Sequence, residues 1–290
     1  MTSRIARYAV GGDVHTGLVT GSTVQDLDLT LRDALVLSAA GCADRVAGSA
    51  VGVERPLDEV TLLAPVPDEA RVFCVGINYL EHQRESADVF AASVPEHPIV
   101  FLKDRSALTS PGADLHLPAA VSEQFDWEVE LGILIGAPAR RLAPEEAWSV
   151  VAGCTVVNDI TARDLQTKHT QWCLGKNVVA GTPVGPWITL TDGVEPEEMN
   201  LELTVNGAPK QKASTAELIF DVPTILSVIS AVTPLRPGDL VATGTPSGVG
   251  FKRTPPEFLA DGDVVTATID TIGVLTNRVV TGAADEGGAS

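Results

Sequence analysis

The sequence contains few basic residues and few aromatic residues. Lys and Arg together number 20 against 38 Asp and Glu in 290 residues, which gives a formal net charge of -18. Nucleic acids and anionic membranes both require basic patches, so this balance argues against either as a partner. A small anionic substrate stays open, because a few Arg and Lys side chains can reverse the field inside one pocket.

Cysteine is also scarce, and apolar runs are short. The four cysteines Cys42, Cys74, Cys154 and Cys173 form no C-x-x-C pair, which favours reduced, mostly buried thiols. Residues 1–8 lack the apolar region of a signal peptide. No apolar run is long enough to span a bilayer. We therefore expect a soluble, cytoplasmic protein.

The pattern along the chain predicts a small N-terminal domain over residues 1–67 and a larger catalytic domain over 68–282. Many strand patterns, few helices and frequent turns favour an α+β, mostly β, architecture over a regular βαβ repeat. Residues 283–290 are typical of a disordered tail. The strands predicted in the larger domain are 72–76, 99–102, 128–135, 153–157, 187–190, 201–205, 240–243 and 264–269, and the helices are 78–90, 144–150, 162–170 and 222–231.

The most informative segment is D-W-E-V-E-L, residues 126–131. Taken as a strand, it places Asp126, Glu128 and Glu130 on one face. Three close carboxylates repel one another when ionised, which raises their pKa values. A bound divalent cation would neutralise that repulsion. Mg²⁺, Mn²⁺ and Ca²⁺ all take oxygen ligands of this kind. The same pattern is also typical of the solvated face of a half-buried strand.

A second acidic segment follows at residues 156–166. An apolar strand ends in Asp159, where a carboxylate is well placed to be a third metal ligand. A simple turn residue is the alternative, and the local sequence favours it. Arg163 is a candidate for binding a substrate carboxylate, or is a solvated helix residue.

Three further segments carry candidate chemistry. His82 and Glu85 share a helix face, and a carboxylate that orients an imidazole makes a general base. Lys176 follows an apolar stretch with Trp172, where its ammonium could stabilise a developing enolate. In residues 243–250, backbone N–H groups and the Thr245 hydroxyl could hold a small anion. Each segment also has a simpler interpretation. His82 and Glu85 could be an incidental surface pair, Lys176 could extend past Trp172 to solvent, and residues 243–250 could be a plain Gly/Pro turn.

Taken in this order, these segments resemble the fumarylacetoacetate hydrolase family over roughly residues 70 to 280. Each piece is weak, but the ordered set is specific. The matching pieces are Gly76-x-Asn78-Tyr79-x-x-His82-x-x-Glu85, Phe101-Leu102-Lys103, Asp126-Trp127-Glu128-Val129-Glu130-Leu131, Asn158-Asp159-x-x-x-Arg163-Asp164-x-Gln166, Gly175-Lys176, Pro183-x-Gly185-Pro186, Val205-Asn206-Gly207, Pro237-Gly238-Asp239 and Thr243-Gly244-Thr245-Pro246-x-Gly248-Val249-Gly250.

The resemblance implies a role for each candidate residue. One divalent cation, Mg²⁺ or else Mn²⁺ or Ca²⁺, would be held by three carboxylates, and Asp126 would lie beside them without being a direct ligand. A His82–Glu85 dyad on a lid segment would activate water. Lys176 would contact the substrate's enolate or oxo group. The metal ligands would be Glu128, Glu130 and Asp159, and the substrate-binding residues would be Gln166, Thr245, Gly244 and Arg163, with Lys103 as a further structural or binding residue.

The fold that the resemblance implies is a mixed β-roll catalytic domain, usually dimeric, preceded by a small N-terminal domain. The reaction that it implies is metal-dependent hydrolysis of a C–C bond in acylpyruvate-type dioxo acids, through a metal-bound enolate. An oxaloacetate-type decarboxylase, or an isomerase or tautomerase acting on 2-hydroxy-diene-dioates, would share that intermediate and is the alternative. Trp127, where many relatives carry Tyr, and residues 86–97 depart from the family pattern, so the small 2-oxo acid substrate cannot be specified further.

Overall fold

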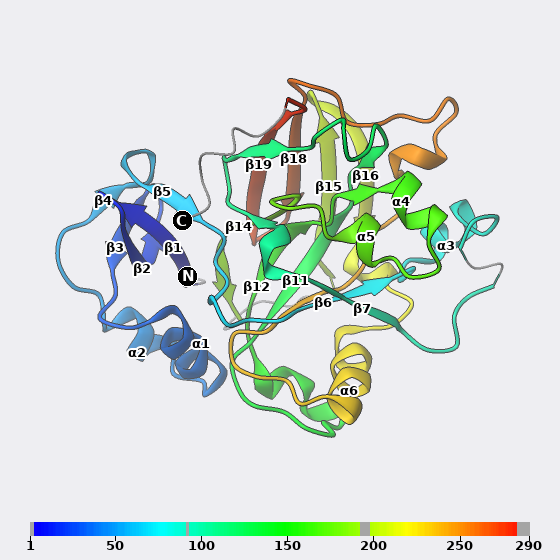
Figure 1. Ribbon diagram of the computed structural model, residues 1–290. Helices are drawn as coiled ribbons and strands as arrows, with labels where there is room; N and C mark the ends of the chain where they lie inside the picture. Colours follow the sequence, from blue (N-terminus) through cyan, green and yellow to red (C-terminus); the bar gives the residue numbers. More distant parts are fainter. Residues whose placement is uncertain (1–2, 91–92, 192–197, 283–290) are drawn as a thin grey trace.

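The computed structural model describes residues 3–90, 93–191 and 198–282, and its fold is α+β and mostly β, as predicted (Figure 1). Two sheets pack face to face, and a short two-stranded ribbon lies beside them. The predicted tail, residues 283–290, lies outside the described residues. No helix in the described ranges is long and apolar enough to cross a membrane.

The larger sheet has 12 strands and runs through both parts of the chain. Two of them lie off the main path, β5 (Thr61–Leu63) beside β1 and β8 (Leu108–Thr109) beside β14. The others, in spatial order, are β4 (Arg55–Pro56), β3 (Thr23–Asp26), β2 (Asp13–Thr20), β1 (Arg4–Val10), β14 (Thr182–Leu190), β12 (Val151–Asn158), β11 (Val129–Ile135), β17 (Leu240–Ala242), β6 (Val72–Gly76) and β7 (Ile99–Lys103).

The smaller sheet has five strands and one buried face. Buried and exposed residues alternate along its strands, as expected when one face packs on a core and the other meets solvent. Its order is β16 (Ala208–Ser214), β15 (Asn200–Val205), β18 (Val264–Ile269), β19 (Gly273–Val280) and β9 (Asp114–His116), and the separate ribbon pairs β10 (Phe125–Asp126) with β13 (Thr161–Ala162).

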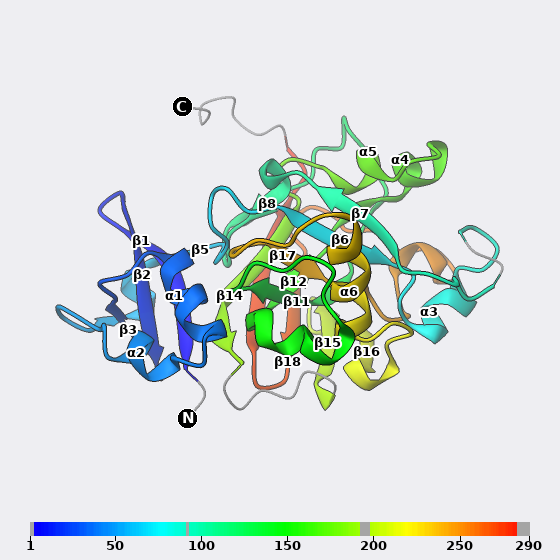
Figure 2. The same cartoon turned by 90° about the horizontal axis from the view of Figure 1, so that it is seen from below.

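The described helices are short, and α1 packs on one face of the larger sheet (Figures 1 and 2). The segment predicted as a helix over 144–150 is a 3₁₀ helix, Pro144–Val150. The α-helices are α1 (Leu31–Ala39), α2 (Ala43–Ala47), α3 (Leu80–Glu85), α4 (Arg163–Lys168), α5 (Cys173–Lys176) and α6 (Val222–Val232).

Strands β11 and β12 form the centre of the molecule, because every residue in both is buried. On one face they pack against the smaller sheet, where Leu131 and Ile133 share a core with Leu203 and Leu275. On the other face, residues of α1 such as Leu35 share a second core with β12 and β17. A strand buried on both faces is a continuous apolar run, which explains the sequence of residues 131–135.

The N-terminal unit is joined to the rest of the chain through the sheet. Strand β1 pairs antiparallel with β14, with Arg4 opposite Thr189 and Ile5 opposite Ile188. Figure 2 shows α1 and α2 beside the N-terminal strands. All four cysteines are free thiols, two of them buried, whereas Cys173 is exposed.

Two sequence predictions are wrong in detail near the site. The helix predicted over 78–90 is limited to α3, which ends where the Ser86 hydroxyl and backbone N–H both bind the His82 carbonyl. The strand predicted over 128–135 begins only at Val129. The chain between β10 and β11 leaves the extended ladder at Trp127 and Glu128, so residues 126–131 are not one strand with a single acidic face.

Candidate active site

Three carboxylates converge where β11 begins and β12 ends. Because Val129 lies opposite Asn158 in the antiparallel pair, Glu128 and Asp159 meet just beyond it, and the Asp159 N–H donates to the Glu128 carbonyl at 2.8 Å. One oxygen from each of Glu128, Glu130 and Asp159 lies within 4.8 Å of the other two. All three side chains are buried. We call this group the carboxylate floor. The structure brings the three predicted ligands together, and their binding of a cation stays a prediction.

The donor set of the carboxylate floor suits a hard divalent cation. It offers only carboxylate oxygens, and it holds them together in a buried place where uncompensated negative charge is costly. Glu128, Glu130 and Asp159 therefore fit a divalent cation of the predicted kind.

Asp126 lies outside the carboxylate floor and has a structural environment of its own. Its oxygens accept the backbone N–H groups of Gly250 and Phe251 at 2.7 and 3.0 Å, and that of Trp127 at 2.8 Å. Arg163 Nε donates to Asp126 Oδ2 at 2.9 Å. Burial raises the pKa of Asp126 despite these donors. Asp126 thus anchors the 250–251 turn and the arginine.

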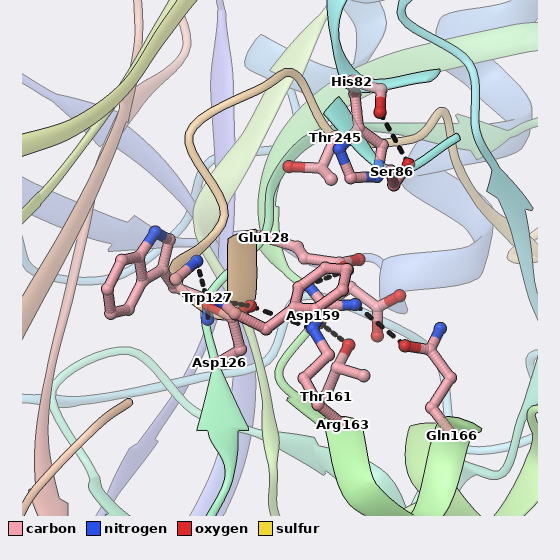
Figure 3. Close-up of polar contacts among 12 residues, drawn as sticks. His82, Ser86, Asp126, Trp127, Glu128, Asp159, Thr161, Arg163, Gln166 and Thr245 are labelled. Carbon is pink, nitrogen blue, oxygen red and sulfur yellow. Dashed lines mark hydrogen bonds and ion pairs between the residues drawn. The ribbon is translucent and has the colours of Figure 1, made fainter. Parts of the chain in front are cut away.

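Three buried cations surround the carboxylate floor. Lys176 Nζ bridges Glu128 Oε2 and Asp159 Oδ2, each at 2.7 Å. Lys103 pairs with the other Asp159 oxygen. An Arg163 terminal nitrogen lies 2.7 Å from Glu128 Oε1 (Figure 3). Buried ions are stable only when paired in this way, so these cations hold the carboxylates in place.

The cations leave the carboxylates in different protonation states. Burial would raise the pKa of Glu128, but Lys176 and Arg163 lower it to about 2. Burial, Asp159 and Glu128 together raise the pKa of Glu130 well above its ordinary value. The pKa of Lys176 is raised as well, because Asp159 and Glu128 outweigh the effect of burial. The floor therefore contains one carboxylate that is readily protonated and one that is firmly ionised.

His82 and Glu85 face the floor from the opposite side of the cavity, on α3. His82 Nδ1 lies 3.2 Å from Glu85 Oε2, and the Gly248 N–H donates to Glu85 Oε1 at 3.0 Å. Gly248 has φ +99°, and a Cβ there would collide with the Lys210 carbonyl, so only glycine fits. Figure 3 shows His82 and Thr245 across Glu128 and Asp159 from Arg163 and Gln166. We call His82 and Glu85 the histidine rim.

The turn at Gly244 and Thr245 contacts the floor directly. The Gly244 N–H donates to Glu130 Oε2 at 2.9 Å. The Thr245 hydroxyl donates to the Val129 carbonyl at 3.0 Å and accepts from Gln211 Nε2 at 2.8 Å. In this arrangement both residues position the floor, and their predicted contact with substrate stays a prediction.

Gln211, on β16, is a site-supporting residue that the sequence analysis missed. It is buried, its Oε1 accepts the Val129 N–H at 3.0 Å, and its Nε2 donates to Thr245 Oγ1 and to the Pro246 carbonyl, both at 2.8 Å. Gln211 therefore links the smaller sheet to the strand between the two floor glutamates. The available signal was its place between Lys210 and Lys212, since alternation turns the middle residue inward.

The floor and His82 of the rim line one cavity with about 310 Å³ of empty space. Lys176, Arg163, Gln166 and Thr245 also line it, so predicted site residues from five chain segments meet there, whereas Glu85 and Gly244 do not line it. Gln166 Oε1 accepts from the Arg163 guanidinium at 2.9 Å, which fixes the amide at the wall. The arrangement combines a cation-binding floor, a buried ammonium and an imidazole around a space for a small ligand.

Family models match almost the whole chain. Residues 71–280 match the model described as "Fumarylacetoacetate (FAA) hydrolase C-terminal". Residues 3–65 match the model described as "Rv2993c-like, N-terminal".

Individual relatives agree with these matches. The oxaloacetate tautomerase YisK of Bacillus subtilis is 41% identical over 225 residues, covering 77% of this chain and 74% of the relative. The mitochondrial oxaloacetate tautomerase Fahd2a of Rattus norvegicus is 35% identical over 278 residues, covering 92% of this chain and 87% of the relative.

Solved structures also resemble this fold over nearly its full length. The 2-hydroxyhepta-2,4-diene-1,7-dioate isomerase from Mycobacterium marinum is 34% identical, with a TM-score of 0.81 over 98% of this chain and 100% of that one. The fumarylacetoacetate hydrolase from Exiguobacterium antarcticum is also 34% identical, with a TM-score of 0.83 over 97% and 100%. This chain belongs to the fumarylacetoacetate hydrolase family.

Proposed function

We propose that the protein interconverts the keto and enol forms of a short 2-oxo acid, with oxaloacetate as the reference substrate. The observation that carries the proposal is the buried Lys176 ammonium beside three convergent carboxylates, facing His82 across a small cavity. Enolisation requires this combination, namely a stabiliser for the oxyanion and a base for the carbon acid. The names of the relatives favour the tautomerase reaction within this chemistry.

The carboxylate floor would hold one divalent cation, which we propose to be Mg²⁺. When bound, such an ion supplies Lewis-acid polarisation of the substrate's carboxylate and keto oxygens. Lys176 donates a hydrogen bond toward the oxygen on C2, where negative charge develops as the enol forms. Arg163, held by Asp126 and Gln166, keeps Glu128 ionised.

The histidine rim moves the proton. With Nδ1 directed at Glu85, the imidazole of His82 has Nε2 free to accept a proton from C3 of the substrate. The electron pair of that C–H bond becomes the C2–C3 double bond, and the His82 imidazolium then gives the same proton to the oxygen on C2. The reverse sequence returns the keto form, so one group serves as base and as acid.

Hydrolysis of a C–C bond in an acylpyruvate, the reaction first expected from the sequence, is the second candidate. The observation that favours it is the same His82–Glu85 contact at 3.2 Å, because an oriented imidazole can also activate water. Decarboxylation of oxaloacetate would use the same enolate stabilisation without needing an attacking water.

Product analysis separates these reactions. The protein is incubated with oxaloacetate, acetylpyruvate and fumarylpyruvate in Mg²⁺ and in EDTA, and products are identified by NMR. The tautomerase proposal predicts Mg²⁺-dependent equilibration of oxaloacetate without loss of carbon. Release of acetate or fumarate would establish hydrolysis instead, and pyruvate formed from oxaloacetate faster than in the protein-free control would establish decarboxylation.

A further inference from the structure

Aromatic residues form only 4% of this chain, yet several gather around the cavity. Phe90 packs edge-on against Trp172 and Phe251, with ring centroids 5.6 and 5.8 Å apart. Trp172 packs edge-on against Phe101 at 5.6 Å. We call Phe90, Phe101 and Trp172 the aromatic partition.

The aromatic partition is fixed on both sides. A Cβ built on Gly76 would lie 2.8 Å from Cη2 of Trp172 and closer still to Cζ3, so the indole rests directly on the β6 backbone. Lys176 Nζ lies 5.4 Å from the centre of the Phe101 ring. The Trp172 carbonyl also accepts the Lys176 backbone N–H at 3.0 Å. Phe101 and Trp172 are thereby tied to Lys176, which pairs with the floor, and Trp172 also to β6.

A second pocket lies on the other side of these rings. The cavity that contains the floor and a larger, more open pocket of about 970 Å³ share Phe90, Phe101 and Trp172 in their linings. Among the described residues, the lining of the outer pocket contains no Lys, Arg, Asp or Glu; its polar members are Gln166, Thr167, His169, Thr170 and Gln171. The outer pocket could therefore take an uncharged chain more readily than a second carboxylate.

We propose that the aromatic partition sets the length limit of the substrate, and this inference rests on the proposed function. The inner cavity has only about a third of the empty space of the outer pocket, which suits a short 2-oxo acid better than a longer one. The partition separates it from the outer pocket, where a longer chain would extend. Phe90 is the specificity-determining residue, since its ring packs on Trp172 and Phe251, away from the ion pairs of the floor, and closes the partition from the α3 side.

The test measures binding rather than turnover. Oxalate, pyruvate and 2-oxohexanoate are titrated calorimetrically into Mg²⁺-loaded wild type, Phe90→Ala, Phe90→Leu and Val89→Ala. The Val89→Ala protein is the matched control, because Val89 precedes Phe90, lines the outer pocket and is absent from the inner one. We expect oxalate affinity to change less than about threefold in every variant.

For 2-oxohexanoate, we expect the affinity of Phe90→Ala to rise roughly tenfold or more, because each methylene moved from water into the apolar space vacated by the Phe90 ring is worth about fourfold. Phe90→Leu should lie between wild type and Phe90→Ala, and it keeps an apolar anchor if the alanine variant is unstable. An equal loss for oxalate and 2-oxohexanoate, or no change for either, would overturn the proposal.

The proposed function can fail separately from this inference. If wild type binds oxalate but does not equilibrate oxaloacetate, the tautomerase proposal fails while the length limit is still measured. If wild type equilibrates oxaloacetate and already binds 2-oxohexanoate as tightly as Phe90→Ala does, the partition proposal fails alone.

Discussion

The carboxylate floor and the histidine rim face each other across one cavity but are held in different ways. The floor carboxylates sit at the ends of central strands, with 0–5% of Glu128 and Asp159 exposed, and receive ion pairs from three other elements. The rim sits on a helix of six residues, and the Glu85 side chain is 22% exposed. Glu85 is tied to the rest of the molecule by the Gly248 N–H.

This difference separates binding from reaction. The floor's geometry is set by the sheet and by buried charge pairs before any ligand arrives, which is what a binding site needs. The rim is set by few contacts and carries the group that would move a proton. Changes at the floor should therefore remove cation binding or stability, whereas changes at the rim should lower turnover and leave binding intact.

The largest effect is expected at the rim. His82→Gln should lower kcat by about 10²–10⁴-fold, the usual contribution of a general base. Oxalate affinity in Mg²⁺, measured by calorimetry, should stay within about threefold of wild type. His97→Gln, an exposed histidine outside the cavity, is the control. A parallel loss of oxalate affinity in His82→Gln would contradict the claim that the floor binds the ligand and the rim only transfers the proton.

Glu130→Gln should remove cation binding from the floor. The substitution keeps the shape and deletes one of three ligand oxygens, so Mn²⁺ affinity should fall by more than about 100-fold, beyond what loss of a supporting residue costs. Stability in EDTA should not fall, because burial already raises the pKa of Glu130. Calorimetry and urea melts check both points, with Glu202→Gln on β15 as control. Unchanged Mn²⁺ affinity would remove Glu130 from the ligand set.

Lys176→Met should make folding dependent on a divalent cation. Without the ammonium, Glu128 and Asp159 are buried beside one another with less compensation, at a cost of about 3–5 kcal/mol in EDTA. Mg²⁺ should restore part of that loss. Lys252→Met, which breaks a surface pair with the exposed Asp88, should cost much less stability and show no response to Mg²⁺. Urea denaturation with and without Mg²⁺ measures the free energy of unfolding of both variants.

Cation affinity should weaken as the pH falls. The raised pKa of Glu130 means that a proton competes with the cation below that pKa, by up to about tenfold in affinity per pH unit. Glu128, with a pKa of about 2, should not contribute in the accessible range. Titrating Mn²⁺ in buffers of different ionisation enthalpy should show proton release on binding. Binding that is independent of pH and releases no proton would mean that Glu130 is ionised beforehand.

The sequence predicts the residues of the floor better than it predicts their support. Glu128 and Glu130 flank one strand residue, and Asp159 follows an apolar strand, so local pattern makes them candidates, and the ordered family motifs select them. The break in the strand at Trp127 depends on N–H groups of Gly250 and Phe251, more than 120 positions away. No local pattern contains that contact.

Contacts between distant strands are the other part of the site that the sequence alone does not predict. Gln211 acts through Val129 and Thr245, which only the packing of the two sheets brings near. The edge contact of β1 with β14 is equally non-local. Helix α3 is shorter than predicted because Ser86 caps it, a competition between side-chain and backbone hydrogen bonds that helical periodicity does not reveal.

The central claim is tested most directly by the rate at which enol-oxaloacetate converts to its keto form, followed by the loss of enol absorbance. Wild type in Mg²⁺ should accelerate the conversion well above the protein-free rate, EDTA should abolish the acceleration, and His82→Gln in Mg²⁺ should lose it while still binding oxalate. Wild type that leaves the protein-free rate unchanged in Mg²⁺, or accelerates it equally in EDTA, would contradict the account.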